Sequence, residues 1–360
     1  MQRQFFLNFL KFLLFLSVGI GILYLVYLNQ NAAYTEDCAL KGIAEEDCSL
    51  LQKVWTDFKS VNYFWILLVL MAFTLSNVSR ALRWNMLLRS LGYRPTFTNA
   101  FLTTFIGYFA NLGLPRMGEI VRPGMMARYE KMKVEKVIGT VVLERMVDVV
   151  TILIVTATAV LVEFDNIAGF FLEYADLAEK LGDPLALLPY LLTPIVLFTA
   201  LFWFFRRKIM ESTLFKKIKE LAIGFWHGLQ SIKDVKQPGL FVFHSLSIWI
   251  LYFAMTYFCF LSFAPTADLS MIAALVVFVF GGWGIVIPSP GGMGTYHFLA
   301  QTALAMYGVS GDDGFSWANI SFFSIQIGCN VLIGIIALAL LPIVNKNYHP
   351  QHLATNGAND

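Results

Sequence analysis

The stretch Asn111-Leu112-Gly113-Leu114-Pro115-Arg116-Met117-Gly118-Glu119-Ile120-Val121-Arg122 decides how this chain folds. It places charged residues, a proline and glycines between two apolar segments, 97–114 and 117–128, which are each too short to cross a bilayer alone. A charged turn of this kind fits neither a solvated loop nor a spanning helix. It predicts a re-entrant helical hairpin, because non-helical backbone survives at membrane depth only where protein or a water-filled cavity surrounds it.

The composition gives the class of protein around this hairpin. The chain is 58% hydrophobic and only 14% charged, with a mean hydropathy of +0.66. We therefore expect an all-α polytopic membrane protein with six transmembrane helices. The predicted spans are 9–28, 63–79, 137–162, 187–205, 240–261 and 316–341. They form one integral membrane domain, 1–345, followed by a short polar tail, 346–360.

The distribution of lysine and arginine predicts the orientation. Basic residues gather at one end of the predicted spans, and the other end is mainly acidic. By the positive-inside rule both termini are cytoplasmic, in a bacterial-type inner membrane. Two amphipathic segments on the basic side, 80–93 and 214–229, are interpreted as helices that lie in the headgroup layer.

A second broken segment lies in the C-terminal half. The apolar run 271–287 is interrupted by Pro288-Ser289-Pro290-Gly291-Gly292-Met293-Gly294, and a helical pattern resumes over 295–307. This predicts a second re-entrant hairpin, which enters from the opposite side by the same charge count. The parts 63–162 and 240–341 then form a probable inverted repeat. Broken helices at corresponding places of two such halves point to a transporter site near the midplane.

The predicted third span carries charges where a membrane helix tolerates few. Glu144 and Asp148 share one helix face, and Arg145 lies about a quarter turn aside. Ionisable groups inside a membrane require partners and mark functional sites. We expect these partners on the first hairpin, at Arg116, Glu119 and Arg122.

Two interpretations of these charges remain open from the residues. A self-neutralising ion network would pin the hairpin to the third span without any substrate. Alternatively, the arginines and the helix N-termini at the two tips would bind an anion such as a phosphate. In that case the substrate-binding residues are Arg116, Glu119, Arg122, Arg145, Asn111, Gly291 and Gly292, and the gating or proton-coupling residues are Glu144, Asp148 and His297.

The remaining motifs are few. Cys38 and Cys48 share one hydrophilic loop and are disulfide candidates if that loop faces an oxidising compartment, whereas Cys259 and Cys329 lie in apolar runs and are interpreted as packing residues. A histidine near a helix start, such as His297, is more often structural than a proton carrier. No metal-ligand spacing, P-loop or dinucleotide fingerprint is present, so we predict no metal and no cofactor.

Several motifs together resemble a known family. They are, in order, Arg83-Trp84; Asn111 with Leu114-Pro115-Arg116, Gly118-Glu119 and Arg122; Glu144-Arg145 with Asp148; and Pro288 with Pro290-Gly291-Gly292-Met293-Gly294. Over about 63–341 the chain resembles the lysylphosphatidylglycerol synthase transmembrane region, the flippase-like family also called UPF0104. In bifunctional members this domain is thought to move aminoacylated lipid between leaflets, while a soluble domain attaches the amino acid. Relatives often have an acidic residue where this chain has His297.

The resemblance implies a flippase-like transporter that moves a phospholipid or another anionic lipid-linked headgroup between leaflets. Because only a short tail follows the last predicted span, we expect no aminoacyl-transferase activity. The alternatives are a membrane-embedded lipid-modifying enzyme with Glu119 or Asp148 as its base, and an accessory subunit of a lipid-processing complex. The expected partners are a membrane lipid substrate and a homo-oligomer or lipid-synthesis enzyme, with no nucleic acid.

Overall fold

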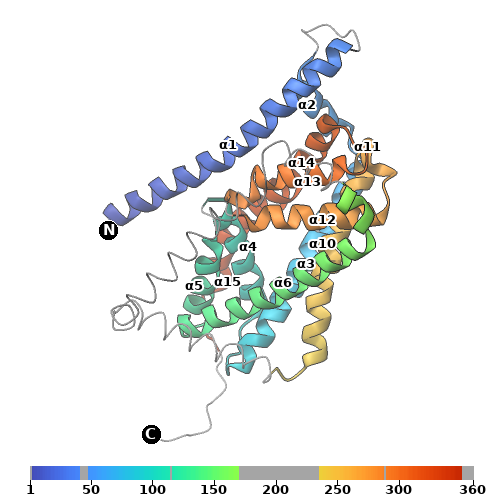
Figure 1. The fold of residues 1–360 in the computed structure, drawn as a ribbon. Coiled ribbons are helices and arrows are strands. Elements are labelled where there is room, and N and C mark those ends of the chain that lie inside the picture. The colour runs from blue at the N-terminus through green and yellow to red at the C-terminus, as the bar shows by residue number, and fades with distance from the viewer. Residues whose placement is uncertain (1, 41–47, 114–115, 170–234, 288, 351–360) are drawn as a thin grey trace, which may run out of the picture.

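The computed structural model describes residues 2–40, 48–113, 116–169, 235–287 and 289–350, and every regular element in these ranges is helical (Figure 1). Within these ranges, four helical runs are long and apolar enough to cross a membrane: α3 (Tyr63–Ser90), α6 (Val134–Val162), α10 (Pro238–Ser262) and the run Gly311–Val344. The protein is therefore a multi-pass helical membrane protein. Four of the predicted spans fall within these runs.

The other predicted segments are placed as follows. The first predicted span, 9–28, lies within the longer helix α1 (Gln2–Leu40). The predicted span 187–205 and the amphipathic segment 214–229 lie outside the described residues, as does the tail from residue 351 onward.

Two pairs of short helices occupy the positions of the two predicted hairpins. The first pair is α4 (Phe97–Gly113) with α5 (Gly118–Tyr129), and the second is α12 (Met271–Val286) with α13 (Thr295–Ala305), preceded by the short turn η2 (Pro290–Gly292). Within each pair the helices pack against each other. Of the two turns, Leu114, Pro115 and Pro288 lie outside the described residues.

Glycines set the close approach of the helices in both pairs. A Cβ at Gly118 would overlap the carbonyl oxygen of Gly107, and one at Gly284 would lie 2.7 Å from the Cα of Tyr296. No other residue fits at these two positions without moving a backbone, because atoms of the facing helix fill the space.

The last long helical run changes its winding in the middle. It consists of α14 (Gly311–Ile325), the π-helical segment η3 (Gln326–Val331) and α15 (Leu332–Val344). The predicted span 316–341 covers most of it. A π-helical turn inside an α-helix often lies at a functional site.

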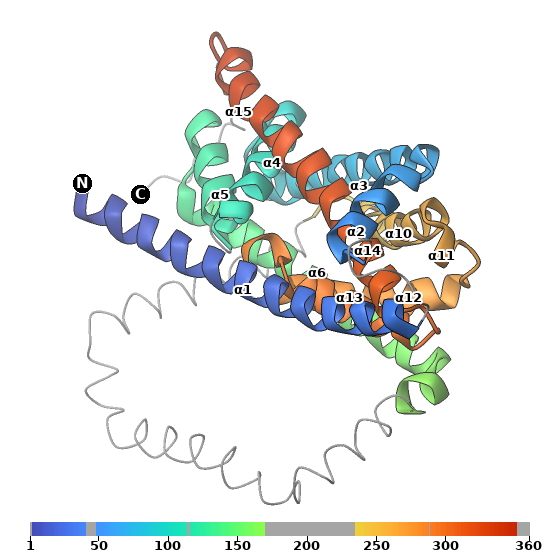
Figure 2. The same ribbon diagram turned by 90° about the horizontal axis from the view of Figure 1, so that it is seen from above.

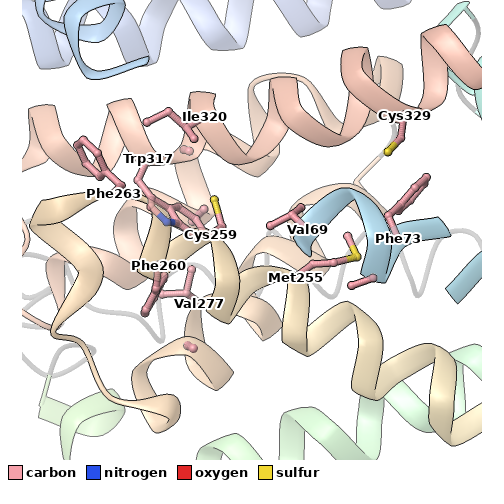
Figure 3. Close-up of a cluster of buried hydrophobic side chains, with 14 of the residues drawn as sticks. Val69, Phe73, Met255, Cys259, Phe260, Phe263, Val277, Trp317, Ile320 and Cys329 are labelled. Atoms are coloured by element: carbon pink, nitrogen blue, oxygen red, sulfur yellow. The ribbon is translucent and has the colours of Figure 1, made fainter. Parts of the chain in front are cut away.

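The hydrophobic core lies where α3, α10, α12 and α14 meet (Figure 3). Phe260 of α10 and Trp317 of α14 are fully buried, and their rings pack edge to face at 5.2 Å. Cys259 and Cys329 are buried free thiols in this core, in agreement with their interpretation as packing residues. Helices α3 and α10 pack along each other and bring the two hairpins into one bundle.

Helix α1 runs along the outside of the bundle and contacts α13 and α14 (Figure 2). Cys38, in the last turn of α1, forms a disulfide with Cys48. Helix α2 (Leu50–Ser60) follows, with the one-turn helix α11 (Ala264–Ala267) at the same end of the bundle (Figure 1). Lys53 of α2 lies 2.8 Å from Asp57 and 2.6 Å from Asp313 of α14. Burial alone would lower the pKa of Lys53, but these two carboxylates raise it above its ordinary value. Lys53 thus ties α2 to the bundle as a cation.

The interpretation of 80–93 as a separate helix in the headgroup layer is wrong. Helix α3 continues without a break from Tyr63 to Ser90, and both Arg80 and Arg83 are buried. The physical reason is that carboxylates on α6 neutralise these arginines, so the helix buries its charges instead of lying at the surface.

Candidate functional site

The centre of the site is a pair of carboxylates on α6. Glu144 and Asp148 are one helical turn apart, and their side chains are 0% and 11% exposed. Arg80 and Arg83 face them from α3. The Oδ2 of Asp148 accepts from the Nη1 of Arg80 at 2.9 Å, and its Oδ1 accepts from the Nη2 of Arg83 at 2.8 Å. These charge-assisted hydrogen bonds hold α3 and α6 together inside the bundle.

Arg122 of α5 reaches the same carboxylates from the first hairpin. Its Nη1 lies 3.0 Å from the Oε2 of Glu144, and its guanidinium carbon lies 3.8 Å from the centre of the Trp84 ring. The indole Nε1 of Trp84 donates to the Oγ1 of Thr140 at 2.9 Å, which fixes the ring. Gly107 makes room, since a Cβ there would lie 3.0 Å from the Cβ of Arg122.

The opposite edge of the Arg122 guanidinium is unused. Its Nε and Nη2 are buried and have no hydrogen-bond partner within the described ranges. This is the edge through which an arginine binds a carboxylate or phosphate with two parallel hydrogen bonds.

Hydroxyl groups surround the two α3 arginines. The Nη2 of Arg80 donates to the hydroxyl of Tyr252 at 3.3 Å, and the Tyr252 and Tyr108 hydroxyls are 3.4 Å apart. The Nη1 of Arg83 donates to the Oγ of Ser245 at 3.2 Å. Helices α4 and α10 therefore also take part in the site.

The charges of this buried cluster do not balance among the described residues, and the other buried carboxylate, Glu130, pairs instead with Thr96, Asn99 and Tyr348. We call Arg80, Arg83, Arg122, Glu144 and Asp148 the ionic site. Its three guanidinium groups face two carboxylates, which leaves one positive charge. An unbalanced charge in the interior is costly, and it favours binding of an anion.

A weaker pair lies at the rim. The Nε of Arg145 lies 3.9 Å from the Oε1 of Glu119, and their side chains are 38% and 45% exposed. The Nη1 of Arg145 is also 3.8 Å from the Oδ2 of Asp148. The rim pair is neutral as a unit, so it leaves the positive excess of the ionic site unchanged.

The turn of the first hairpin positions its residues differently. Arg116 is exposed, has a φ of 63° and forms no ion pair with another described residue, so it does not join the cluster predicted for it. Asn111 has a structural contact, because its Oδ1 accepts from the backbone N–H of Gly118 at 2.7 Å and closes the turn.

The turn of the second hairpin meets the first. A Cβ at Gly291 would lie 2.7 Å from the Cδ2 of Leu112, the last-but-one residue of α4. The Nε2 of Gln326 donates to the carbonyl oxygen of Gly291 at 2.8 Å, and Asn330 donates to Gln326 at 2.6 Å. Gly291 and Gly292 have φ values of 60° and 84°, which glycine adopts without strain. The π-helical segment thus holds the two turns together.

His297 belongs to α13, and its ring packs against α14. It is fully buried, and its ring packs on Phe322 at 4.7 Å and on Phe315 at 6.4 Å. None of the ion pairs of the ionic site includes it.

Arg80 and Arg83 were missed as site residues in the sequence. A signal was present, because Arg83 belongs to the Arg83-Trp84 motif and the two arginines share one helix face with Asn77. Hydropathy ended the span at residue 79 and placed both arginines outside it. No signal in the sequence marked Tyr108 or Tyr252, which are 144 residues apart in the chain.

The described residues contain no group of three or more histidine, cysteine, aspartate or glutamate side chains placed to hold a metal ion. The described side chains of the site are arginines, carboxylates and hydroxyl groups.

Fold and site together define a multi-pass helical membrane protein with a buried, net cationic site beside a broken helix. Residues 49–341 match the family of the lysylphosphatidylglycerol synthase TM region, and the chain belongs to this family. A UPF0104 membrane protein of Methanocaldococcus jannaschii is 29% identical over 128 residues, which is 34% of this chain. The match covers 38% of that relative. No solved structure matches the chain.

Proposed function

We propose that this protein is a flippase-like transporter that moves a phospholipid, or another lipid with an anionic headgroup, between the two leaflets. The observation that carries the proposal is the single positive charge left over at the ionic site, deep in a membrane protein. A phosphodiester headgroup carries one negative charge and would balance it.

Arg122 is the residue we propose to bind the headgroup phosphate. Its Nε and Nη2 edge has no partner within the described ranges, and the Trp84 ring keeps the guanidinium plane in place. A phosphate at this edge would receive two parallel hydrogen bonds. Because the Arg122 side chain is only 5% exposed, the hairpin must move to admit the lipid.

We propose a gating role for the carboxylates. Glu144 lies between Arg122 at 3.0 Å and Arg83 at 3.6 Å, so an arriving phosphate would compete with Glu144 for Arg122. Asp148 is held by two arginines and would keep α3 in register with α6. This arrangement argues against Asp148 as an enzymatic base, because two bound guanidinium groups stabilise its charged form.

The proposed topology has six transmembrane helices and two re-entrant hairpins in an inverted repeat, with both termini cytoplasmic in a bacterial-type inner membrane. It is supported by the order of the elements, since each short pair, α4–α5 and α12–α13, stands between long apolar helices. The meeting of Leu112 and Gly291 would put the two turns at one depth. A homo-oligomer or a lipid-synthesis enzyme is the partner we propose.

The test is scrambling of fluorescent phospholipids in proteoliposomes. We expect Arg122→Gln to lower the flux of an anionic lipid at least about tenfold, because the variant loses a pair of charge-assisted hydrogen bonds to the phosphate. Arg122→Lys keeps the charge without the two-pronged edge and should restore flux only in part. The matched control is Arg128→Gln, an exposed arginine on the same helix.

Folding is checked by the thermal midpoint in detergent, and only variants that fold are compared. If Arg122→Gln transports lipid at the same rate as the wild type, Arg122 does not bind the headgroup. No flux in the wild type with any anionic lipid, together with product formation from lipid and a donor, would favour an enzyme instead.

A further inference from the structure

A cavity of about 470 Å³ lies where the end of α3 meets the start of α10. Its size falls in the range of roughly 300–1,000 Å³ typical of small-molecule sites. Arg89, Arg94 and Lys236 line it, and none of the described residues lining it is acidic. The ionic site does not include these three cations.

No described residue pairs with the cations of this cavity. Arg89, Arg94 and Lys236 are exposed, and no ion pair joins any of them to another described residue. Three cations around one hollow, with no carboxylate among its described lining residues, attract an anion and repel cations.

The apolar part of the lining shows what kind of anion fits. Met86, Pro95 and Val235 also line the cavity, and the last two are buried. An inorganic phosphate would leave this apolar surface in contact with water. A phospholipid would place its phosphate on the cations and its glycerol and first methylenes on the apolar surface, which lowers the exposed apolar area.

The cavity and the ionic site lie along the same helix interface. Ser90 lines the cavity and is seven residues after Arg83, which is two helical turns or about 10 Å along α3. Gln237 of the cavity directly precedes α10 and is followed at four-residue steps by Phe241 and Ser245 of that helix. The centre of the Phe241 ring lies 5.9 Å from the Arg83 guanidinium carbon, and the Oγ of Ser245 accepts a hydrogen bond from Arg83.

We propose that this α3–α10 cavity is a docking site for the phosphate of an anionic phospholipid from the adjoining leaflet, which then passes Phe241 to reach the ionic site. The passage to the ionic site rests on the proposed function. The docking itself is a binding property and is tested separately from transport.

The test is binding of dioctanoyl phosphatidylglycerol to the purified full chain in a neutral detergent, with dioctanoyl phosphatidylcholine and inorganic phosphate as comparisons. The test variant is Arg89→Gln/Arg94→Gln/Lys236→Gln. The matched control is Arg128→Gln/Lys133→Gln/Lys136→Gln, which removes three exposed positive charges around the turn between α5 and α6.

We expect the test variant to weaken phosphatidylglycerol binding about tenfold or more, since each basic residue near a membrane surface contributes to binding of anionic lipid. The control variant should bind within about threefold of wild type. In proteoliposomes the test variant should need a higher mole fraction of anionic lipid for half-maximal flux, whereas Arg122→Gln should still dock lipid.

Unchanged phosphatidylglycerol binding in the test variant, or equal loss in the control, would overturn the docking site while leaving Arg122 as the test of the proposed function. Equal binding of phosphatidylcholine would overturn the charge argument. Inorganic phosphate that binds as tightly as the lipid would overturn the lipid assignment.

Discussion

The two hairpins of this protein have the same build and opposite chemistry. In α4–α5 the returning helix carries Arg122, which pairs with Glu144 of α6. In α12–α13 the returning helix begins with Thr295, whose hydroxyl donates to the carbonyl oxygen of Gly284 at 2.6 Å. An ion pair joins the first hairpin to α6, whereas neutral hydrogen bonds and glycine contacts join the two helices of the second hairpin to each other and to α14.

This difference separates structure from function. The second hairpin demonstrates that a broken helix pair can be held in this bundle without any charge. Charge is therefore not a general requirement for holding a broken helix pair in this bundle, and a buried ion pair is in general weak evidence for stability. We propose that the buried charge of the first hairpin serves a substrate, as the proposed function states.

The largest expected effect comes from a substitution in the ionic site. Asp148→Asn leaves Arg80 and Arg83 buried without a full counter-charge, and we expect it to lower the free energy of unfolding by about 3–5 kcal/mol. The measurement is thermal unfolding of the purified protein in detergent, together with the yield of monodisperse protein.

The matched change in the second hairpin is Thr295→Val, which removes one hydroxyl and should cost about 1 kcal/mol. Asp268→Asn is the control for charge, since Asp268 is exposed and should change stability by less than about 0.5 kcal/mol. Equal losses from Asp148→Asn and Thr295→Val would contradict the distinction between the ionic site, which the first hairpin joins through Arg122, and the neutral second hairpin.

An intermediate effect is expected where the hairpins are alike. Gly118→Ala would push a methyl group into Gly107, and Gly284→Ala would push one into Tyr296. Each should lower the free energy of unfolding by about 1–3 kcal/mol, the usual cost of overpacking. The thermal midpoint in detergent measures both.

Gly124→Ala is the control within α5, because a Cβ there meets nothing within 4 Å. It should be neutral or stabilise the protein by up to about 1 kcal/mol, since alanine favours a helix over glycine. A thermal midpoint for Gly118→Ala equal to that of Gly124→Ala would show that α4 and α5 are not packed at Gly107.

The smallest effect is expected at the rim. Arg145→Gln removes the partner of Glu119 at 3.9 Å, but both side chains are more than a third exposed and solvent screens the pair. We expect a change below about 1 kcal/mol. If Arg145→Gln lowers the free energy of unfolding as much as Asp148→Asn does, Arg145 belongs to the ionic site.

Much of the fold followed from local pattern. The breaks at residues 114–117 and 288–294 were predicted because proline and glycine interrupt apolar runs, and the helices on either side begin and end close to the predicted residues. The pairing of Arg122 with Glu144 was also expected. The exposure of Arg116 was not, because the side on which a turn residue points depends on how the hairpin is docked.

Hydropathy, helical period and the positions of proline and glycine were thus sufficient for the class of protein and for the two broken helices, since these depend on neighbours in the chain. Only the tertiary structure decided which charges meet. Arg80 and Asp148 are 68 residues apart, and their ion pair exists because α3 packs against α6. Hydropathy averaged over neighbouring residues assigns Arg80 to the surface, because the average includes the cost of burying its charge. The average cannot include a partner that lies on another helix.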